Sequence, residues 1–123
     1  MRSVITTTLI VVLLPSSALA GKIYGIIKEG GKPVRSGVEV RIITISDKPK
    51  LMARSETDRN GLYRLYVRET GEFNLTVRDT LHHEGDDLSM TVRSYQKSVR
   101  YNLVIQKTEQ EKGKPAKFIL RRE

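Results

Sequence analysis

The 123-residue sequence contains no cysteine. Disulfide bonds are therefore excluded, and a stable fold has to come from a packed core. A cysteine-linked lipid anchor and a cysteine nucleophile are excluded as well. After residue 20, no segment approaches the roughly 20 apolar residues that a membrane-spanning helix needs. No segment after residue 20 shows a useful length of helical periodicity either, so an all-β domain is the expected fold.

Acidic residues are the scarcer charge, since 14 aspartates and glutamates stand against 22 lysines and arginines, for a net charge of +8. Such a surplus favours encounters with phospholipid headgroups, acidic polysaccharides or nucleic acid. The cations are scattered among acidic residues, as on an ordinary solvated surface, so we expect only weak attraction to anionic surfaces. No nucleic acid partner is expected, because the sequence shows no basic stretch interleaved with aromatic residues.

The first 20 residues have the three parts of a secretory signal peptide. A cation at Arg2 precedes an apolar run over residues 4–14, and Pro15 is followed by small residues that end in Ala18, Leu19 and Ala20. The apolar run is too short to span a bilayer. The sequence therefore predicts a signal peptide over residues 1–20 and an exported chain, periplasmic or extracellular, that does not span the membrane after signal removal.

Residues 21–107 read as one β domain. Turn-forming residues recur roughly every eight to twelve positions, between segments that alternate apolar with polar side chains. The pattern predicts a seven- to eight-stranded antiparallel Greek-key sandwich, with a closed barrel as the alternative. Residues 108–123 are predicted to form a charged linker followed by a C-terminal tail or an extra strand.

Three local features are expected within this domain. The alternation slips at Ile42 and Ile43, which predicts a β-bulge or a strand end buried on both faces. Residues 51–56 are expected to form a weak edge strand. Residues 63–68 and 72–78 alternate on either side of a short glycine-containing turn, so they are predicted to pair as an antiparallel hairpin.

Three stretches, GIIKEGGKPVRSGVEVRI, TDRNGLYRLYV and GEFNLTV, resemble the carboxypeptidase regulatory-like domain, within the transthyretin-like sandwiches. The resemblance covers residues 22–77 well and residues 88–106 only as a pattern. It implies an accessory fold that supports, binds or assembles beside another protein, without an enzymatic activity of its own. The matching positions are Gly25, Ile27, Gly31, Pro33, Val34, Val38, Val40, Thr57, Asp58, Gly61, Tyr63, Gly71, Phe73, Leu75 and Val77.

Three of these positions are predicted to shape turns. Asp58 is expected to cap its turn through its own carboxylate, and Gly61 to hold a backbone angle that a Cβ opposes. Gly71 closes the turn between the two alternating segments. All three are therefore interpreted as structural residues.

The densest group of candidate metal ligands is formed by His82, His83, Glu84, Asp86 and Asp87. Nitrogen and oxygen donors of this kind suit zinc or nickel. However, neighbouring residues on an extended backbone point to opposite sides, and no further histidine completes a site. A solvated loop without metal or cofactor is the main expectation, and a small-ligand or divalent-metal-binding module using this loop is the alternative function.

No catalytic residue is predicted. The sequence lacks a G-x-S-x-G elbow as well as cysteine, and its final LRRE differs from the Tyr-Arg-Gly-Ser end of a transthyretin-like hydrolase in purine breakdown. The expected function is that of a non-enzymatic exported module, acting as an accessory, binding or assembly protein in the envelope or outside the cell. Its expected partner is another exported or envelope protein, with Phe118, Ile119 and Leu120 as candidate partner-binding residues that could add to another sheet.

Overall fold

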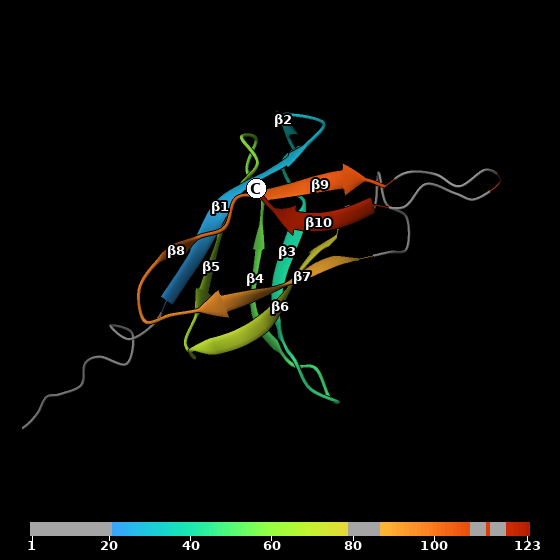
Figure 1. Ribbon diagram of the computed structural model, residues 1–123. Coiled ribbons are helices and arrows are strands. Elements are labelled where there is room, and N and C mark those ends of the chain that lie inside the picture. The colour runs from blue at the N-terminus through green and yellow to red at the C-terminus, as the bar shows by residue number, and fades with distance from the viewer. Residues whose placement is uncertain (1–20, 79–86, 109–112, 114–117) are drawn as a thin grey trace, which may run out of the picture.

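Figure 1 shows the computed structural model, which describes residues 21–78, 87–108, 113 and 118–123. The predicted signal peptide lies outside the described residues. The described ranges form ten strands and contain no helix that could serve as a membrane span. The strands are β1 (Gly21–Glu29), β2 (Lys32–Pro33), β3 (Glu39–Thr44), β4 (Leu51–Glu56), β5 (Leu62–Val67), β6 (Gly71–Arg78), β7 (Leu88–Ser94), β8 (Val99–Arg100), β9 (Leu103–Lys107) and β10 (Phe118–Arg122).

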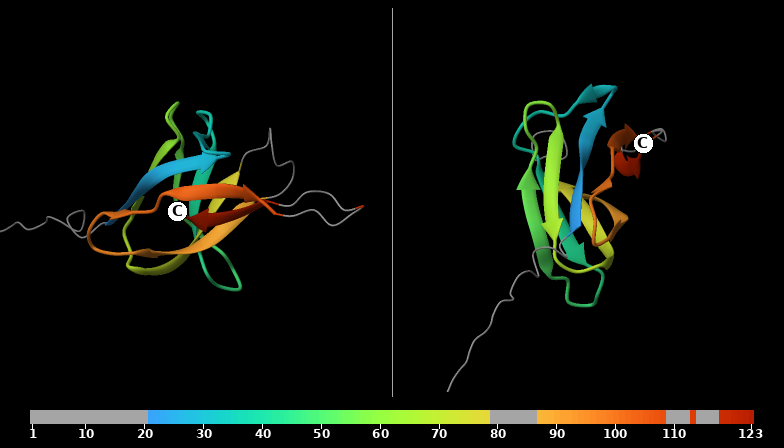
Figure 2. Two further views of the ribbon diagram at one scale, coloured as in Figure 1. Left: turned by 45° about the horizontal axis from the view of Figure 1, so that its top comes forward. Right: turned by 90° about the vertical axis from the view of Figure 1, so that its left-hand side faces the viewer.

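The strands form two sheets that make a sandwich-like arrangement. In the six-stranded sheet, β1 is central, with β5 and β2 along one edge and β8 and β9 along the other. β10 lies beyond β9 in the same sheet, as Figures 1 and 2 also show. The four-stranded sheet has the order β4-β3-β6-β7. β4 contacts β5 and β10 contacts β7, so the two sheets approach each other at both edges.

The sequence predicted a purely antiparallel sandwich. The structure differs, because β8 and β9 run parallel to β1. Side-chain alternation reports which face of a strand is buried and carries no information about the direction of its neighbour. The strand number also exceeds the predicted seven to eight. The additional strands are the two-residue β2 and β8, the latter separated from β9 by Tyr101 and Asn102.

The break between β8 and β9 follows from the close approach of two backbones. The amide of Tyr101 donates to the carbonyl of Tyr24 at 2.8 Å, and the amide of Ile26 donates to Oδ1 of Asn102 at 3.2 Å. A Cβ on Gly25 would lie only 2.0 Å from the carbonyl oxygen of Tyr101. Glycine is therefore required at position 25, and the Asn102 side chain replaces a backbone acceptor where the ladder is interrupted.

The predicted hairpin between residues 63–68 and 72–78 is wrong. β5 pairs with β1, whereas β6 pairs with β3 and β7, so the intervening turn carries the chain from one sheet to the other. Both segments bury alternate side chains in the same core. A period of two is therefore equally compatible with pairing in one sheet and with stacking across two sheets.

Gly71 begins β6 with a φ of 127°, which favours glycine.

Two local predictions for the four-stranded sheet are confirmed. The register of β3 against β4 shifts between Ile42 and Ile43, where the alternation slips in the sequence. β4 lies at the edge of its sheet.

The core lies between the two sheets and is filled by aliphatic side chains with a few aromatic rings. Tyr63 is 1% exposed, and its hydroxyl donates to the carbonyl of Tyr101 at 2.6 Å. The Tyr101 hydroxyl in turn accepts from the amide of Arg93 at 2.9 Å, which ties β5 and the β8–β9 break to β7. Burial raises the pKa of the Tyr63 hydroxyl far above its ordinary value of 10.0, so this group stays protonated in the folded chain.

The turn before β5 is built by Asp58 and Gly61. Oδ1 of Asp58 accepts from the amides of Asn60 at 2.8 Å and Leu62 at 3.0 Å. Gly61 has a φ of +76°, and a Cβ there would lie 2.8 Å from the carbonyl oxygen of Ile27. The aspartate therefore satisfies the turn amides, while the glycine permits both the backbone angle and the close approach to β1.

Candidate binding surface

The outer face of the six-stranded sheet carries a concentration of positive charge. Five cations occupy outward positions on four of its strands, and we call this set the basic face. They are Lys22 and Lys28 of β1, Arg64 of β5, Arg100 of β8 and Arg121 of β10. The one acidic residue within the strands of this sheet is Glu29, at the end of β1.

Three cations of the basic face lie near Tyr24, two of them at its ring and one opposite it on the neighbouring strand. Tyr24 is directly opposite Arg64 on β5 and Arg100 on β8. The Lys22 ammonium lies 4.9 Å from the centre of the Tyr24 ring, and the Arg100 guanidinium lies 5.7 Å from it. Cations at this range are attracted to the ring face, so Tyr24 holds both charges close to the sheet.

Additional contacts fix the position of Arg100. Its Nε donates to Oδ1 of Asn102 at 3.2 Å, and its carbonyl oxygen accepts from the Arg122 guanidinium at 2.9 Å. Arg122 itself lies 4.3 Å from the centre of the Tyr101 ring. Within the described part of the chain, the two terminal nitrogens of Arg100 make no hydrogen bond. They can donate to an external oxyanion as a planar fork.

The outer face of the four-stranded sheet has a different electrostatic character, because its arginines are paired with carboxylates. The nitrogen–oxygen distances are 2.6 Å for Arg41–Glu39 and Arg54–Glu39, 2.8 Å for Arg78–Asp87 and 2.9 Å for Arg93–Glu72. Hydrogen bonds from Arg54 and then Arg41 hold the pKa of Glu39 below its ordinary value, and Arg78 does the same for the pKa of Asp87. Charge on this face is thus internally compensated.

No comparable pairing exists on the basic face. Among the described residues, none of its five cations lies within ion-pair distance of a carboxylate. Arg121 instead donates through Nε to the side-chain oxygen of Gln106 at 2.8 Å. The two outer faces therefore differ in whether their positive charge is neutralised by other described residues.

Apolar and aromatic side chains lie between these cations. Tyr66, beside Lys22, is 63% exposed, and Ile119 of β10 is 45% exposed. Ile26 and Val104 are half-buried on the same face. The face thus combines cations that have no carboxylate partner in the described ranges with exposed tyrosine and aliphatic groups.

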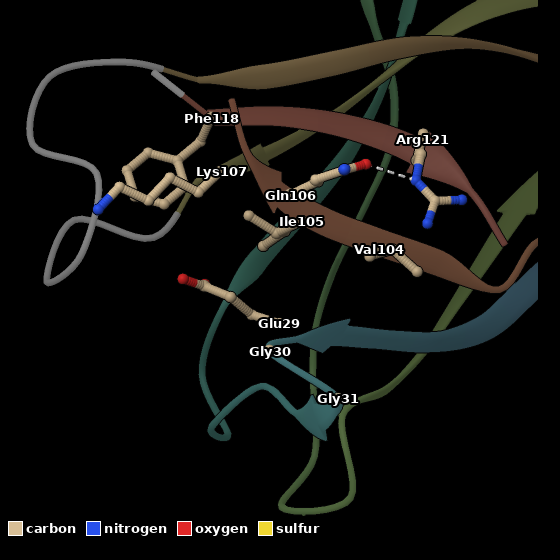
Figure 3. A pocket seen from close by; sticks show the side chains of 9 residues that line it. All are labelled: Glu29, Gly30, Gly31, Val104, Ile105, Gln106, Lys107, Phe118 and Arg121. Carbon is tan, nitrogen blue, oxygen red and sulfur yellow. Dashed lines mark hydrogen bonds between the residues drawn. The ribbon is translucent and has the colours of Figure 1, made fainter. Parts of the chain in front are cut away.

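A shallow groove of about 540 Å³ adjoins the basic face (Figure 3). The β1–β2 turn forms one wall, and β9 and β10 form the other. It contains Glu29, the Gln106–Arg121 hydrogen bond, Lys107 and the ring of Phe118. Groups of both charges and an amide could bind a small polar ligand, and Arg121 belongs to both the groove and the basic face.

The candidate metal ligands are not brought together in the described structure. His82, His83, Glu84 and Asp86 lie outside the described residues. Asp87 is described, and both its carboxylate oxygens accept from Arg78, at 2.8 and 3.1 Å. Residues 21–78, 87–108, 113 and 118–123 contain no cluster of three or more side chains of the metal-binding types.

The apolar end of the chain belongs to the sandwich itself. Phe118, Ile119 and Leu120 begin β10, which pairs antiparallel with β9. Leu120 is 8% exposed and lies in the core, and Phe118 packs against the core. Of the three residues expected to bind a partner, Ile119 alone is exposed.

Sequence reasoning did not find the basic face. Its members extend from Lys22 to Arg121, and they meet because β1 pairs with β5 on one edge and with β8 and β9 on the other. Basic and aromatic residues were not expected to come together, because they do not alternate within any one stretch of the sequence. The sequence did contain a signal for this face. Lys22, Tyr24 and Lys28 occupy alternate, outward-facing positions of one strand, and Arg64 and Tyr66 occupy such positions of another.

Comparison with known proteins places the chain by its fold. No family model and no curated protein matches the sequence. Among solved structures, a DUF3823 family protein from Parabacteroides merdae is similar, with a TM-score of 0.52 and 16% identity over 84% of this chain and 58% of that chain. An (S)-allantoin synthase is similar with a TM-score of 0.55 and 11% identity, over 87% of this chain and 45% of that chain.

These likenesses define a class of structure. The chain is an all-β protein with a sandwich-like fold, of the kind also found in an uncharacterised DUF3823 protein. It spans about half the length of the two solved chains. At such low identity the likeness shows the fold alone, so function has to be inferred from the chain's own surface.

Proposed function

We propose that this chain is an exported, non-enzymatic β-sandwich module that binds an anionic component of the cell envelope through its basic face. The observation that carries the proposal is the contrast between the two outer faces. Arginines of the four-stranded sheet are paired with carboxylates, whereas the five cations of the basic face have no carboxylate partner among the described residues. Unpaired charge concentrated on one face attracts oppositely charged partners and orients them.

The sequence supports the other parts of this proposal. The pattern of residues 1–20 is typical of a secretory signal, which favours an envelope or extracellular location. The stretches around Gly25, Asp58, Gly61 and Tyr63 resemble the carboxypeptidase regulatory-like domain, whose members usually act as accessory folds. An accessory, binding or assembly role beside an envelope component is consistent with both.

The structure also changes how such binding is expected to work. Partner capture by a free C-terminal tail is disfavoured, because β10 is paired with β9 and Leu120 is buried in the core. The rigid sheet face offers a binding surface that costs less ordering on association than a tail.

A soluble polyanion provides the direct test. We expect wild-type protein to be retained on immobilised heparin and to bind polyglutamate in calorimetry. The triple variant Lys22→Gln, Arg64→Gln, Arg100→Gln should lose most of this binding, because it removes the cations around Tyr24.

The matched control removes the same number of charges from the four-stranded sheet. Arg54→Gln, Arg78→Gln, Arg93→Gln alters side chains that are about half exposed and already paired with carboxylates. This control should retain most of the polyanion binding. Equal losses in the two triple variants would show that net charge alone matters, and the proposal would then be wrong.

A further inference from the structure

We propose that the anionic component is a lipid bilayer surface, on which the basic face lies flat. This inference rests on the proposed function and names its partner class. A bilayer containing anionic lipids presents negative charge over a plane and attracts nearby basic groups. The arrangement of cations, rings and aliphatic groups on this sheet fits a plane better than it fits a single extended polymer.

The charges of the basic face are spread in two dimensions. Lys22 and Lys28 are six residues apart on β1, which places them about 20 Å from each other at roughly 3.3 Å per residue. Arg64 and Arg121 belong to strands on opposite sides of β1, with β9 between β1 and β10. At about 4.8 Å between neighbouring strands, the charges cover a width of about 14 Å. They therefore occupy an area and not a line.

An extended polymer would need a continuous path across the basic face. Proteins that bind an extended polyanion hold it along a charged groove. The groove of Figure 3 lies along β9, β10 and the β1–β2 turn, and its lining does not include Lys22, Arg64 or Arg100. It therefore does not connect the two ends of the basic face.

The side chains between the charges suit a membrane interface. Tyrosine rings and the stems of lysine and arginine are favoured at the boundary between headgroups and water, where one end is apolar and the other polar. Tyr66 is exposed beside Lys22, and Ile119 is exposed beside Arg121. These side chains can enter the headgroup layer while the cations contact phosphates.

The distribution of charge over the two faces also favours one orientation. On the opposite face, Glu39, Glu72 and Asp87 pair with the arginines around them. Within the described part of the chain, the basic face is therefore the one whose charge is unbalanced. An anionic bilayer is expected to hold the molecule in one orientation, with the four-stranded sheet directed away from the membrane.

Vesicle sedimentation tests the inference. We expect wild-type protein to sediment with vesicles of phosphatidylcholine mixed with phosphatidylglycerol, but not with phosphatidylcholine alone, and to be released as salt rises. Each cation near such a surface strengthens binding by about fivefold, so Lys22→Gln, Arg64→Gln, Arg100→Gln should weaken it by on the order of a hundredfold. The control triple at Arg54, Arg78 and Arg93 should bind nearly as wild type.

Fluorescence tests the orientation, because the sequence contains no tryptophan. Tyr66→Trp places a single reporter on the basic face, and Thr91→Trp places one at an exposed position on β7 of the other sheet. With anionic vesicles, the emission of the first variant should shift to the blue and that of the second should stay unchanged. Equal shifts in the two variants would overturn the proposed docking face.

The failure of the lipid inference can be distinguished from failure of the proposed function. If the basic-face triple loses heparin and polyglutamate binding but wild-type protein does not sediment with anionic vesicles, the partner is a polymer and the lipid inference is wrong. Tighter binding to a single-stranded oligonucleotide than to the vesicles would also overturn it. If wild-type protein binds neither polyanions nor vesicles, both proposals are wrong. Unchanged thermal unfolding of the variants confirms that lost binding is not lost folding.

Discussion

Replacing Tyr63 by phenylalanine tests whether the buried tyrosine contact stabilises the sandwich. The change removes one hydroxyl, and with it the 2.6 Å hydrogen bond to the carbonyl of Tyr101, while the ring stays in the core. A buried acceptor left without a partner costs about 1–3 kcal/mol. We expect a loss of about 1–2 kcal/mol in the free energy of unfolding. For a domain of this size that corresponds to a decrease in Tm of roughly 5 to 15 °C.

The same variant gives a pH dependence of known sign. The pKa of Tyr63 is raised above its ordinary value of 10.0 in the folded chain, mainly by burial. Above pH 10.0 the unfolded chain therefore holds fewer protons at this residue than the folded chain, and stability falls as pH rises. Tyr63→Phe lacks this contribution. The stability difference between wild type and variant should be constant up to the ordinary tyrosine pKa and shrink above it.

Urea denaturation followed by far-UV circular dichroism, repeated from neutral to alkaline pH, measures both effects. Tyr66→Phe is the matched control, because that side chain is 63% exposed and its hydroxyl makes no hydrogen bond within the described residues. The control should change neither stability nor its pH dependence. A Tyr63→Phe variant as stable as wild type at neutral pH would refute the role assigned to the hydroxyl.

Three further predictions concern the edge strand, the turn and an ion pair. Leu120→Ala should lower the free energy of unfolding by about 2–3 kcal/mol, because Leu120 is a buried side chain of β10. The control Ile119→Ala should change it by less than about 0.5 kcal/mol, and equal effects of the two variants in denaturant titrations would contradict the packing of β10. Asp58→Ala should cost about 1–2 kcal/mol by removing the acceptor of two turn amides, and thermal unfolding of Asp58→Asn, which keeps Oδ1, should show a smaller loss. Asp87→Asn should lower the free energy of unfolding by less than about 1 kcal/mol at neutral pH, because its pair with Arg78 is solvent-exposed. Since that pair lowers the pKa of Asp87 in the folded state, the stability difference between wild type and variant should be present above the ordinary value of 3.8 and disappear as pH falls below it.

Local chemistry explains why parts of the fold could be predicted. Alternating side chains identified the buried faces of β5 and β6, because residues two apart on a strand lie on the same face. The slip at Ile42 and Ile43 coincides with the register shift, since an extra residue changes the phase of the alternation. These features depend on neighbouring residues, so they can be read from the sequence.

Pairing partners could not be predicted in the same way. The segments of β5 and β6 are joined by a short turn, yet they belong to different sheets. Gly25 was identified by resemblance alone, and its physical role appears only where the carbonyl of Tyr101 approaches β1. Such contacts join residues that are far apart in the chain, and nothing in either local pattern specifies them.

The sequence by itself determined an all-β chain with one aliphatic core, because composition and a period of two act through local backbone geometry. Only the tertiary structure decided that β8 and β9 run parallel to β1 and that the C-terminal strand completes the same sheet. It also decided where the positive charge gathers. Cations separated by up to 99 positions, from Lys22 to Arg121, come to share one sheet face, since strand pairing and not sequence distance sets which side chains lie on the same face.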